Sequence, residues 1–563
     1  MIYHCEDHTC NYWDEGEKLP ERCPQCGRKL LRANEADMTG DDWTALGNTL
    51  WYAEASDKKR MVDCFRKAAY LGSAWGVCNL GICMEQGNGV EADPVQAFWL
   101  YQQAVEMGSL NAVCCLGVCY QYGIGTAPDA EKAAELYCKA AEYGSPRGQM
   151  LLARAFHDGI GVEADAAEAV HWVRAAAYQR YGEGMHRLGE CYAYGDGVEQ
   201  NWEHAVHWFR EAAESGVSEA MTDLGYCYEK GCGVEQSWEQ AFSWYRRSAE
   251  CGNPVSMSNL GLCYQMGYGV EQNWQEAIKW YEQGAQCGDL QSMNNLAYCY
   301  ERGEGVEQNE DRALYWYRRG AEAGSVHCMF CLGWNYSNGV GVKQDMTEAI
   351  RWYTAAAEGG NAAAMHSLGW HYDHGEGVEQ DMKKAIYWYE RAAEQNRPAA
   401  MNSLGECYAM GRGVPRDLET AMEWYRRAAE LGEAMADYNM GWHLEQAGKL
   451  SEAYAHYRKA ADGNDDSAWW ALGRFYENGV VVAQDGKEAR RCYETGEKLG
   501  SVKCKMRLAR CKLLGIGGRR EKKAGLDLCR QALELAKESS EKEDYGYEAE
   551  MNLLRRTIAE NES

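Results

Sequence analysis

Apolar residues recur along this chain with a period far longer than one helical turn. The pair Leu-Gly, or a close variant, returns every 36 residues from Leu80 to Gly441. One further copy precedes this stretch, at Leu46, and two follow it, at Leu472 and Leu508. A fixed period of this size is typical of a solenoid, in which each repeat buries its apolar face against its neighbours. The pattern therefore predicts an all-α chain of about fourteen repeats.

Each repeat contains two stretches of helical periodicity separated by Gly-x-Gly. Around Leu260, residues 254–267 and 273–288 each allow about three helical turns, with apolar residues at spacings of three and four. Asp, Asn or Ser opens the second stretch and predicts an N-cap, and a Gly after it predicts a left-handed residue at its end. Arg180 and Asn396 replace that Gly in two repeats. Each repeat is therefore expected to be an antiparallel helix pair.

A tryptophan recurs in the middle of the second stretch, usually followed by Tyr or Phe and then by paired Ala residues. Large rings beside small residues suit the close packing of stacked helix pairs. We therefore expect the tryptophans to belong to the core. They are Trp172, Trp208, Trp244, Trp280, Trp316, Trp352, Trp388 and Trp424.

The whole repeat matches a known pattern. The segment from Ala220 to Gly252 follows A-x3-LG-x2-Y-x2-G-x-GV and continues to the Trp-Tyr and the terminal Gly described above. It resembles the Sel-one-like repeat, a relative of the tetratricopeptide repeat, and the resemblance covers residues 41 to about 520. It implies a right-handed superhelical solenoid of antiparallel helix pairs that serves as a scaffold or adaptor without catalytic residues. The repeat at Gly479 departs from the pattern because Val replaces the second Gly of its loop.

A different pattern precedes the repeats. Cys5, Cys10, Cys23 and Cys26 form C-x4-C and C-x2-C pairs, and thiolates on two tight turns suit tetrahedral zinc. A module this small needs such a metal to fold. It resembles the rubredoxin-like zinc ribbon, which also permits iron, but its lengthened first turn favours structural zinc and leaves His8 as an alternative to Cys5. We expect a zinc ribbon at 1–30, a linker at 31–40, the solenoid at 41–518 and a helical cap at 519–563.

Comparison of the repeats with one another predicts a binding face. Counting the repeat Leu as zero, positions −4, −3, 0, +1, +3 and +4 hardly change and fall on one helix face, whereas −2, +2, +5 and +6 vary and lie opposite. In the later repeats these variable positions are strongly aromatic. We expect them to line a concave groove that binds a protein or peptide, although packing between repeats is an open alternative. The residues are Tyr226, Tyr298, Phe330, Trp334, His366, Trp370, His374, Tyr438, Trp442 and Trp470.

The composition of the chain limits the kinds of partner and the cellular location that the sequence predicts. The net charge of −27 argues against nucleic acid as a partner of the repeats and fits basic proteins or neutral peptides better. No apolar run approaches the length of a membrane span, and the start lacks the features of a signal peptide, so a cytoplasmic location without membrane contact is expected. Eight cysteines three residues after the repeat Leu are expected to be small buried thiols. They are Cys83, Cys119, Cys191, Cys227, Cys263, Cys299, Cys407 and Cys511.

No group of residues predicts catalysis. His366, His371 and His374 are close in sequence, but position +3 puts His371 on the packed face and the other two outside it, so a metal site is not expected. Nothing apart from the repeat pattern resembles a nucleophile with its base, so neither an enzyme nor a small-molecule substrate is predicted. A rival hypothesis is a regulator that the zinc ribbon directs to nucleic acid or the transcription machinery; a specificity subunit of another enzyme also stays open.

Overall fold

A computed structural model describes residues 2–5, 13–15, 30–33, 37–51, 55–542 and 548–562. Of the predicted zinc ligands, Cys10, Cys23, Cys26 and the alternative His8 lie outside the described residues, while Cys5 is the last residue of the first strand. Among the described helices, none combines the length and hydropathy needed to cross a bilayer.

The short strands near the amino terminus form one antiparallel sheet in the order β2-β1-β3. They are β1 (Ile2–Cys5), β2 (Trp13–Glu15) and β3 (Leu30–Ala33). His4 pairs with Trp13, and Cys5 pairs with Leu30. The start of β2 and the start of β3 therefore lie at the Cys5 end of β1.

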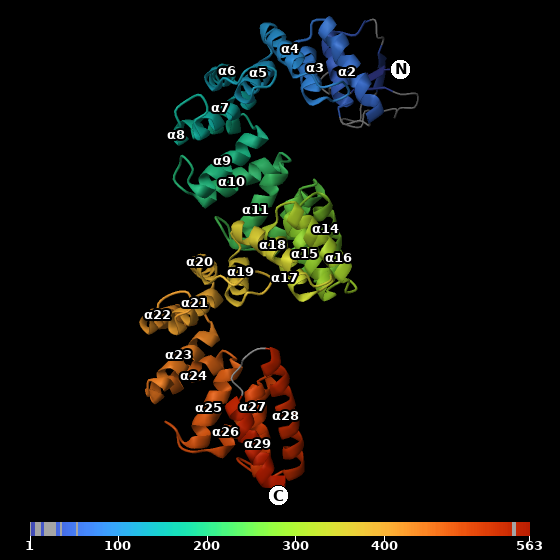
Figure 1. Cartoon of the computed structure of the whole chain (residues 1–563). Helices are drawn as coiled ribbons and strands as arrows, with labels where there is room; N and C mark the ends of the chain where they lie inside the picture. The colour runs from blue at the N-terminus through green and yellow to red at the C-terminus, as the bar shows by residue number, and fades with distance from the viewer. Residues whose placement is uncertain are drawn as a thin grey trace. The chain divides into compact units, whose positions relative to one another are not determined.

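All other described elements are helices, and α1 to α28 follow one another as fourteen helix pairs (Figure 1). The prediction of an all-helical repeat solenoid is confirmed for this part of the chain. The first helices of the pairs are α1 (Gly40–Thr49), α3 (Ala74–Gln86), α5 (Leu110–Tyr122), α7 (Pro146–Asp158), α9 (Gly182–Tyr194), α11 (Ser218–Lys230), α13 (Pro254–Met266), α15 (Leu290–Arg302), α17 (Val326–Asn338), α19 (Ala362–His374), α21 (Pro398–Met410), α23 (Ala434–Gln446), α25 (Asp466–Asn478) and α27 (Val502–Leu514). The second helices are α2 (Ala55–Tyr70), α4 (Pro94–Glu106), α6 (Ala130–Glu142), α8 (Ala166–Tyr178), α10 (Trp202–Glu214), α12 (Trp238–Glu250), α14 (Trp274–Gln286), α16 (Glu310–Glu322), α18 (Met346–Glu358), α20 (Met382–Glu394), α22 (Leu418–Glu430), α24 (Leu450–Asp462), α26 (Gly486–Lys498) and α28 (Lys522–Lys542). Helix α29 (Glu548–Glu562) packs on α27 and α28 after the last pair.

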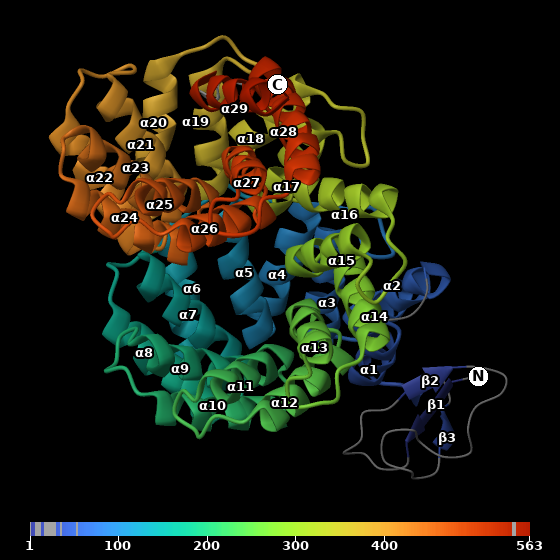
Figure 2. The same cartoon turned by 90° about the horizontal axis from the view of Figure 1, so that it is seen from below.

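The chain divides into an N-terminal part, Met1–Ser292, and a C-terminal part, Met293–Ser563. Within the N-terminal part, the first helices α7, α9, α11 and α13 lie on the inner side of the curve that the repeats follow (Figure 2). Within the C-terminal part, α21, α23 and α25 likewise lie inside α22, α24 and α26. Successive first helices also contact one another, as α5 does α7 and α25 does α27. Side chains on the exposed face of the first helices therefore lie close to those of the next repeat.

The local signals in the sequence act as expected. Asp93 accepts a hydrogen bond from the backbone of Gln96 at the start of α4, and Asn309 does the same for Arg312 at the start of α16. The Gly after most second helices has positive φ, and Arg180 and Asn396 adopt the same conformation where Gly is missing. Val481, which replaces the second loop Gly, also keeps a φ of 64°. The positive φ at these positions is therefore imposed by the structure of the repeat, because it is kept where the residue is not glycine.

The Gly of each Leu-Gly pair lets the two helices of a repeat approach closely. A Cβ on Gly261 would lie 2.5 Å from the Tyr281 ring, and one on Gly225 would lie 2.6 Å from the Tyr245 ring. Both tyrosines are almost completely buried. Where the ring is replaced by Val173, the glycine position is Ala153. In the repeat of α15 and α16, Ala297 replaces the glycine although the opposing residue is still a tyrosine, Tyr317, and the structure offers no explanation for it.

The tryptophan prediction is only partly correct. The fully buried ring of most repeats is the Tyr or Phe that follows the Trp, while the Trp itself is half-buried. A helix turns by about 100° per residue, so the two adjacent rings cannot both face the partner helix. Several tryptophans instead lie beside a cation, such as Trp244 under Arg247 at 4.3 Å and Trp424 under Arg427 at 4.5 Å.

The eight cysteines at position +3 are all buried and unpaired, as predicted. Burial raises the pKa of Cys227 and of Cys263 to about 12. A thiol in such a site stays protonated at neutral pH and acts as a small apolar side chain.

Candidate functional site

The first helices present one recurring exposed position, two residues after the repeat Leu. In the C-terminal part this position holds the side chains that we call the aromatic ladder: Tyr298, Trp334, Trp370 and Trp442. Tyr298, Trp334 and Trp442 are 40%, 42% and 37% exposed, and Trp370 is half-buried. Tyr226 and Leu262 hold the same position in the N-terminal part and are also exposed. Exposed aromatic rings recurring at one position of neighbouring helices are typical of a binding surface.

Exposed rings also occur elsewhere, for example Tyr315 on α16 and Tyr387 on α20, which are 53% and 48% exposed. These lie on second helices. The aromatic ladder differs from them because its members lie on first helices and recur there at one repeat position.

The predicted residues at position −2 behave differently from the aromatic ladder. Phe330 and His366 lie against the buried tyrosines of their own repeats, with ring centroids 5.9 Å from Tyr353 and 5.7 Å from Tyr389. Tyr438 lies 5.6 Å from Tyr457 in the same way. Burial lowers the pKa of His366 to about 4. These half-buried rings pack within their own repeats, so they are less available to a partner than the exposed rings of the aromatic ladder.

Two further predicted residues have local partners. The ring of His374 stacks on Trp370 at 4.3 Å, and its Nδ1 lies 2.9 Å from the Trp370 carbonyl oxygen. Trp470 is half-buried between the Arg474 guanidinium at 4.5 Å and the Lys503 ammonium at 5.2 Å. His371 is buried on the packed face, as position +3 predicts.

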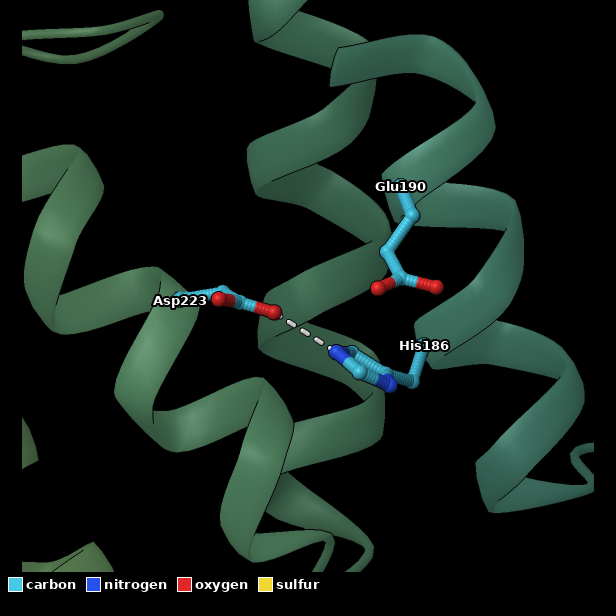
Figure 3. A group of neighbouring side chains, drawn as sticks. All are labelled: His186, Glu190 and Asp223. Carbon is cyan, nitrogen blue, oxygen red and sulfur yellow. Dashed lines mark hydrogen bonds and ion pairs between the residues drawn. The ribbon is translucent and has the colours of Figure 1, made fainter. Parts of the chain in front are cut away.

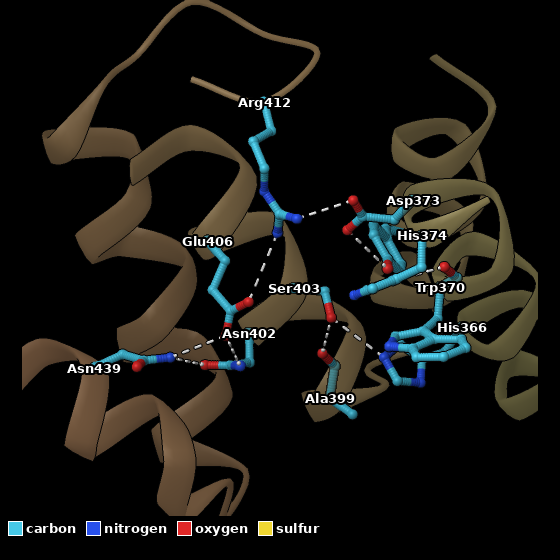
Figure 4. Close-up of polar contacts among 11 residues, drawn as sticks. His366, Trp370, Asp373, His374, Ala399, Asn402, Ser403, Glu406, Arg412 and Asn439 are labelled. Carbon is cyan, nitrogen blue, oxygen red and sulfur yellow. Dashed lines mark hydrogen bonds and ion pairs between the residues drawn. The ribbon is translucent and has the colours of Figure 1, made fainter. Parts of the chain in front are cut away.

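A polar network interrupts the aromatic ladder between Trp370 and Trp442 (Figure 4). Glu406 occupies the ladder position on α21 and accepts hydrogen bonds from Asn402 at 3.0 Å and Asn439 at 3.2 Å. Its carboxylate lies 3.8 Å from Arg412, which also binds the buried Asp373 at 2.9 Å. Burial raises the pKa of Glu406, although Arg412 and the two amides oppose this shift. Of the two carboxylates in the network, Glu406 is the one that occupies the ladder position between the aromatic rings.

The N-terminal part contains a charged cluster that the sequence alone did not reveal. His186 and Glu190 on α9 point toward Asp223 on α11, and their donor atoms lie within 4.8 Å of one another (Figure 3). His186 Nε2 lies 2.6 Å from Asp223 Oδ2, and this carboxylate raises the pKa of His186 although burial opposes it. Glu190 accepts a hydrogen bond from Arg187 at 3.2 Å. Because the charges are paired with one another, the cluster links successive first helices without requiring a metal.

A wide cavity of about 1160 Å³ lies in the N-terminal part, at the amino-terminal ends of α3, α5 and α7. Ser73, Ser109 and Ser145 line it and cap these helices. Ser73 also donates a hydrogen bond to Asp41 at 2.7 Å. Trp75 and Met107 also line this cavity, but no aromatic side chain recurs along it at one repeat position as it does in the aromatic ladder.

Comparisons with known proteins agree with this architecture. The family model described as Sel1 repeat matches thirteen consecutive segments between residues 76 and 537. The crystal structure of c5321, a protective antigen of uropathogenic Escherichia coli strains with an SLR fold, is 29% identical, with a TM-score of 0.56 over 76% of this chain and 94% of that one. A Sel1 repeat protein from Oxalobacter formigenes is 33% identical over 44% of this chain and 98% of its own, with a TM-score of 0.41.

No curated protein sequence matches the chain. The family model nevertheless covers most of the residues, and its matched segments fall on the helix pairs from α3 to α28. The chain therefore belongs to the Sel1 repeat family.

Proposed function

We propose that this chain is a non-catalytic scaffold that binds a peptide segment of a partner protein along the aromatic ladder. Sel1 repeats generally mediate protein interactions, which supports a scaffold but does not identify the surface. The observation that carries the proposal is the exposure of Tyr298, Trp334 and Trp442 at one repeated position of the first helices. Large rings held on rigid helices bury much apolar area on binding at little cost in conformational entropy.

The charges of the groove indicate the chemistry of the partner. Glu406 lies in the ladder position between Trp370 and Trp442, and the whole chain carries a net charge of −27. A segment with apolar side chains flanking a Lys or Arg would complement this arrangement. We therefore propose a basic, partly apolar peptide as the partner. Nothing in the described residues supports the rival hypothesis of a regulator directed to nucleic acid.

Trp334 and Trp370 occupy the ladder position in two successive repeats. Peptides that bind the intact chain can be selected from a random library. We expect these peptides to bind the Trp334→Ala, Trp370→Ala variant at least about thirtyfold more weakly than the intact chain, which is a loss of about 2 kcal/mol of binding free energy. The reason is that two anchoring rings are lost at the centre of the interface. Fluorescence anisotropy with labelled peptides measures the change.

Tyr315→Ala, Tyr387→Ala is the matched control, because it removes two exposed rings from second helices. This control is expected to keep peptide affinity. Equal binding by the intact chain and the Trp334, Trp370 variant would reject the ladder as the binding surface. A fall in the thermal midpoint of the Trp variant, with unchanged affinity, would assign these rings to packing instead.

We further propose that Cys5, Cys10, Cys23 and Cys26 hold a structural zinc ion. The support is the register of the small sheet: the first cysteine pair begins at the end of β1, the second precedes β3, and Cys5 pairs with Leu30. Both cysteine pairs therefore lead into the same end of the sheet. Four thiolates fit tetrahedral zinc, and the ion would serve to hold this small module folded.

Metal analysis of the purified chain is expected to give about one zinc per molecule, and the Cys23→Ser, Cys26→Ser variant is expected to lose it, because two thiolates alone bind zinc weakly. Cys251→Ser, Cys287→Ser is the matched control, since both cysteines are exposed on the repeats. Iron instead of zinc would correct the choice of metal. A metal-free intact chain, or an unchanged zinc content in the first variant, would refute the site.

A further inference from the structure

One repeat of the N-terminal part lacks the buried ring of its neighbours. The second helices place Phe65, Tyr101, Tyr137, Phe209, Tyr245 and Tyr281 against the preceding first helix, and each of these rings is buried. In α8 the same position holds Val173. Ala153 replaces the opposing Gly, but its single methyl group is much smaller than the missing ring. The repeat formed by α7 and α8 is therefore underfilled.

A cavity of about 320 Å³ lies at this place, between α7, α8 and α9. Ala153, Val173 and Cys191 line it, and each of these side chains is almost completely buried. Val170 and Met150 add further apolar surface. An apolar cavity of about 150 Å³ already accommodates benzene, so the space is sufficient for one aromatic ring.

A complete repeat shows what normally fills this space. In the repeat of α11 and α12, the Tyr245 ring lies against Gly225, and its hydroxyl donates to Glu229 at 2.8 Å. Burial, and then Glu229 and the nearby Cys263 of the next repeat, raise the pKa of Tyr245, so its ring lies in the vicinity of the Cys263 side chain. The positions equivalent to Gly225, Glu229 and Cys263 are Ala153, His157 and Cys191, and all three line the cavity. The cavity therefore occupies the position of the absent tyrosine ring.

The rim of the cavity is polar and its charges are paired. His157 Nδ1 lies 2.7 Å from Asp158, and His157 Nε2 lies 3.4 Å from Asp196, which follows α9. Arg187 binds Asp196 at 2.8 Å, and Arg154 lies 3.5 Å from Asp158. The rim thus offers carboxylate oxygens that can accept a hydrogen bond from a hydroxyl, while the interior is apolar and suits an uncharged ring.

We propose that this cavity binds a single phenol ring in the place of the missing tyrosine side chain. The ring belongs either to a free small phenol or to a tyrosine of a bound peptide, and both share the same chemistry. The apolar walls would cover the ring, and the rim would accept the hydrogen of its hydroxyl. This site involves none of the residues of the aromatic ladder and goes beyond the scaffold function proposed above.

The test uses p-cresol, which is the tyrosine side chain itself, and N-acetyltyrosinamide, which carries the same ring on a peptide unit. We expect p-cresol to bind the intact chain at one site, measured by calorimetry. The Ala153→Gly, Val173→Tyr variant restores the residue pair of the other repeats and fills the cavity. It is expected to fold, to have a higher thermal midpoint and to bind p-cresol at least about tenfold more weakly.

The outcomes separate the two sources of the ring. Binding of both probes to the intact chain alone supports a peptide tyrosine as the ligand, and binding of p-cresol alone supports a free small phenol. No binding of either probe, or equal binding of p-cresol by the filled variant, overturns the proposal. The Trp334→Ala, Trp370→Ala variant should bind p-cresol normally, so failure of the ladder hypothesis and failure of this one are distinguishable.

Discussion

Gly261→Ala is expected to destabilise the chain by about 1–3 kcal/mol, although alanine is normally the better residue inside a helix. The added Cβ would lie 2.5 Å from the Tyr281 ring, which is completely buried. The ring cannot move freely because its hydroxyl also donates to Gln265 at 2.7 Å. The strain is therefore expected to exceed the gain of about 1 kcal/mol from helix propensity. A fall in the thermal midpoint measures it.

The control for this prediction comes from the chain itself. Tyr281→Val copies the pair of Ala153 and Val173, so Gly261→Ala should cost much less in that background. A double-mutant cycle of the four proteins isolates the interaction between the two positions. If Gly261→Ala raises the midpoint in the wild-type background, close approach of the ring is not the reason for the glycine.

Glu477→Ala is expected to cost about 3–5 kcal/mol, because it removes the largely buried carboxylate that Arg510 binds and leaves Arg507 with Glu550 alone. The Glu477 carboxylate binds Arg507 at 3.3 Å and also Arg510, and it accepts a hydrogen bond from Tyr493 at 2.8 Å. Its side chain is 10% exposed and that of Arg507 is 15% exposed. Arg507 in turn binds Glu550 of α29 at 2.7 Å. Hydrogen exchange should become faster in α27 and α29.

Glu229→Ala is the matched control, since Glu229 holds the same position in another repeat. It accepts a hydrogen bond from the Tyr245 hydroxyl at 2.8 Å, and it pairs at 2.7 Å with Lys230, whose side chain is exposed to solvent. Loss of one hydrogen bond of this kind is expected to cost about 1 kcal/mol. Equal effects of the two substitutions would show that the arginines of α27 do not depend on Glu477.

Much of the fold could be predicted because its signals are local. The N-caps such as Asp93 and Asn309, the glycines of the turns and the apolar period each act within a few residues, and the same signals recur in most repeats. Because the repeats can be compared with one another, the exposed positions of the first helices could also be predicted from the sequence. The zinc ligands remain a sequence prediction, because three of the four cysteines lie outside the described residues.

The candidate sites could not be predicted in full, because they depend on contacts between helices. The repeat period of the sequence does not specify which side chains make those contacts. The sequence by itself determined the helix pairs, their caps and turns, and the recurrence of aromatic residues at position +2 of the first helices. Only the tertiary structure decided that Tyr281 rather than Trp280 is buried, that Phe330 and Tyr438 pack inward, and that the space beside Val173 stays open. The physical reason is that burial depends on the shape of the opposing surface, and that surface is formed by residues about twenty or more positions away.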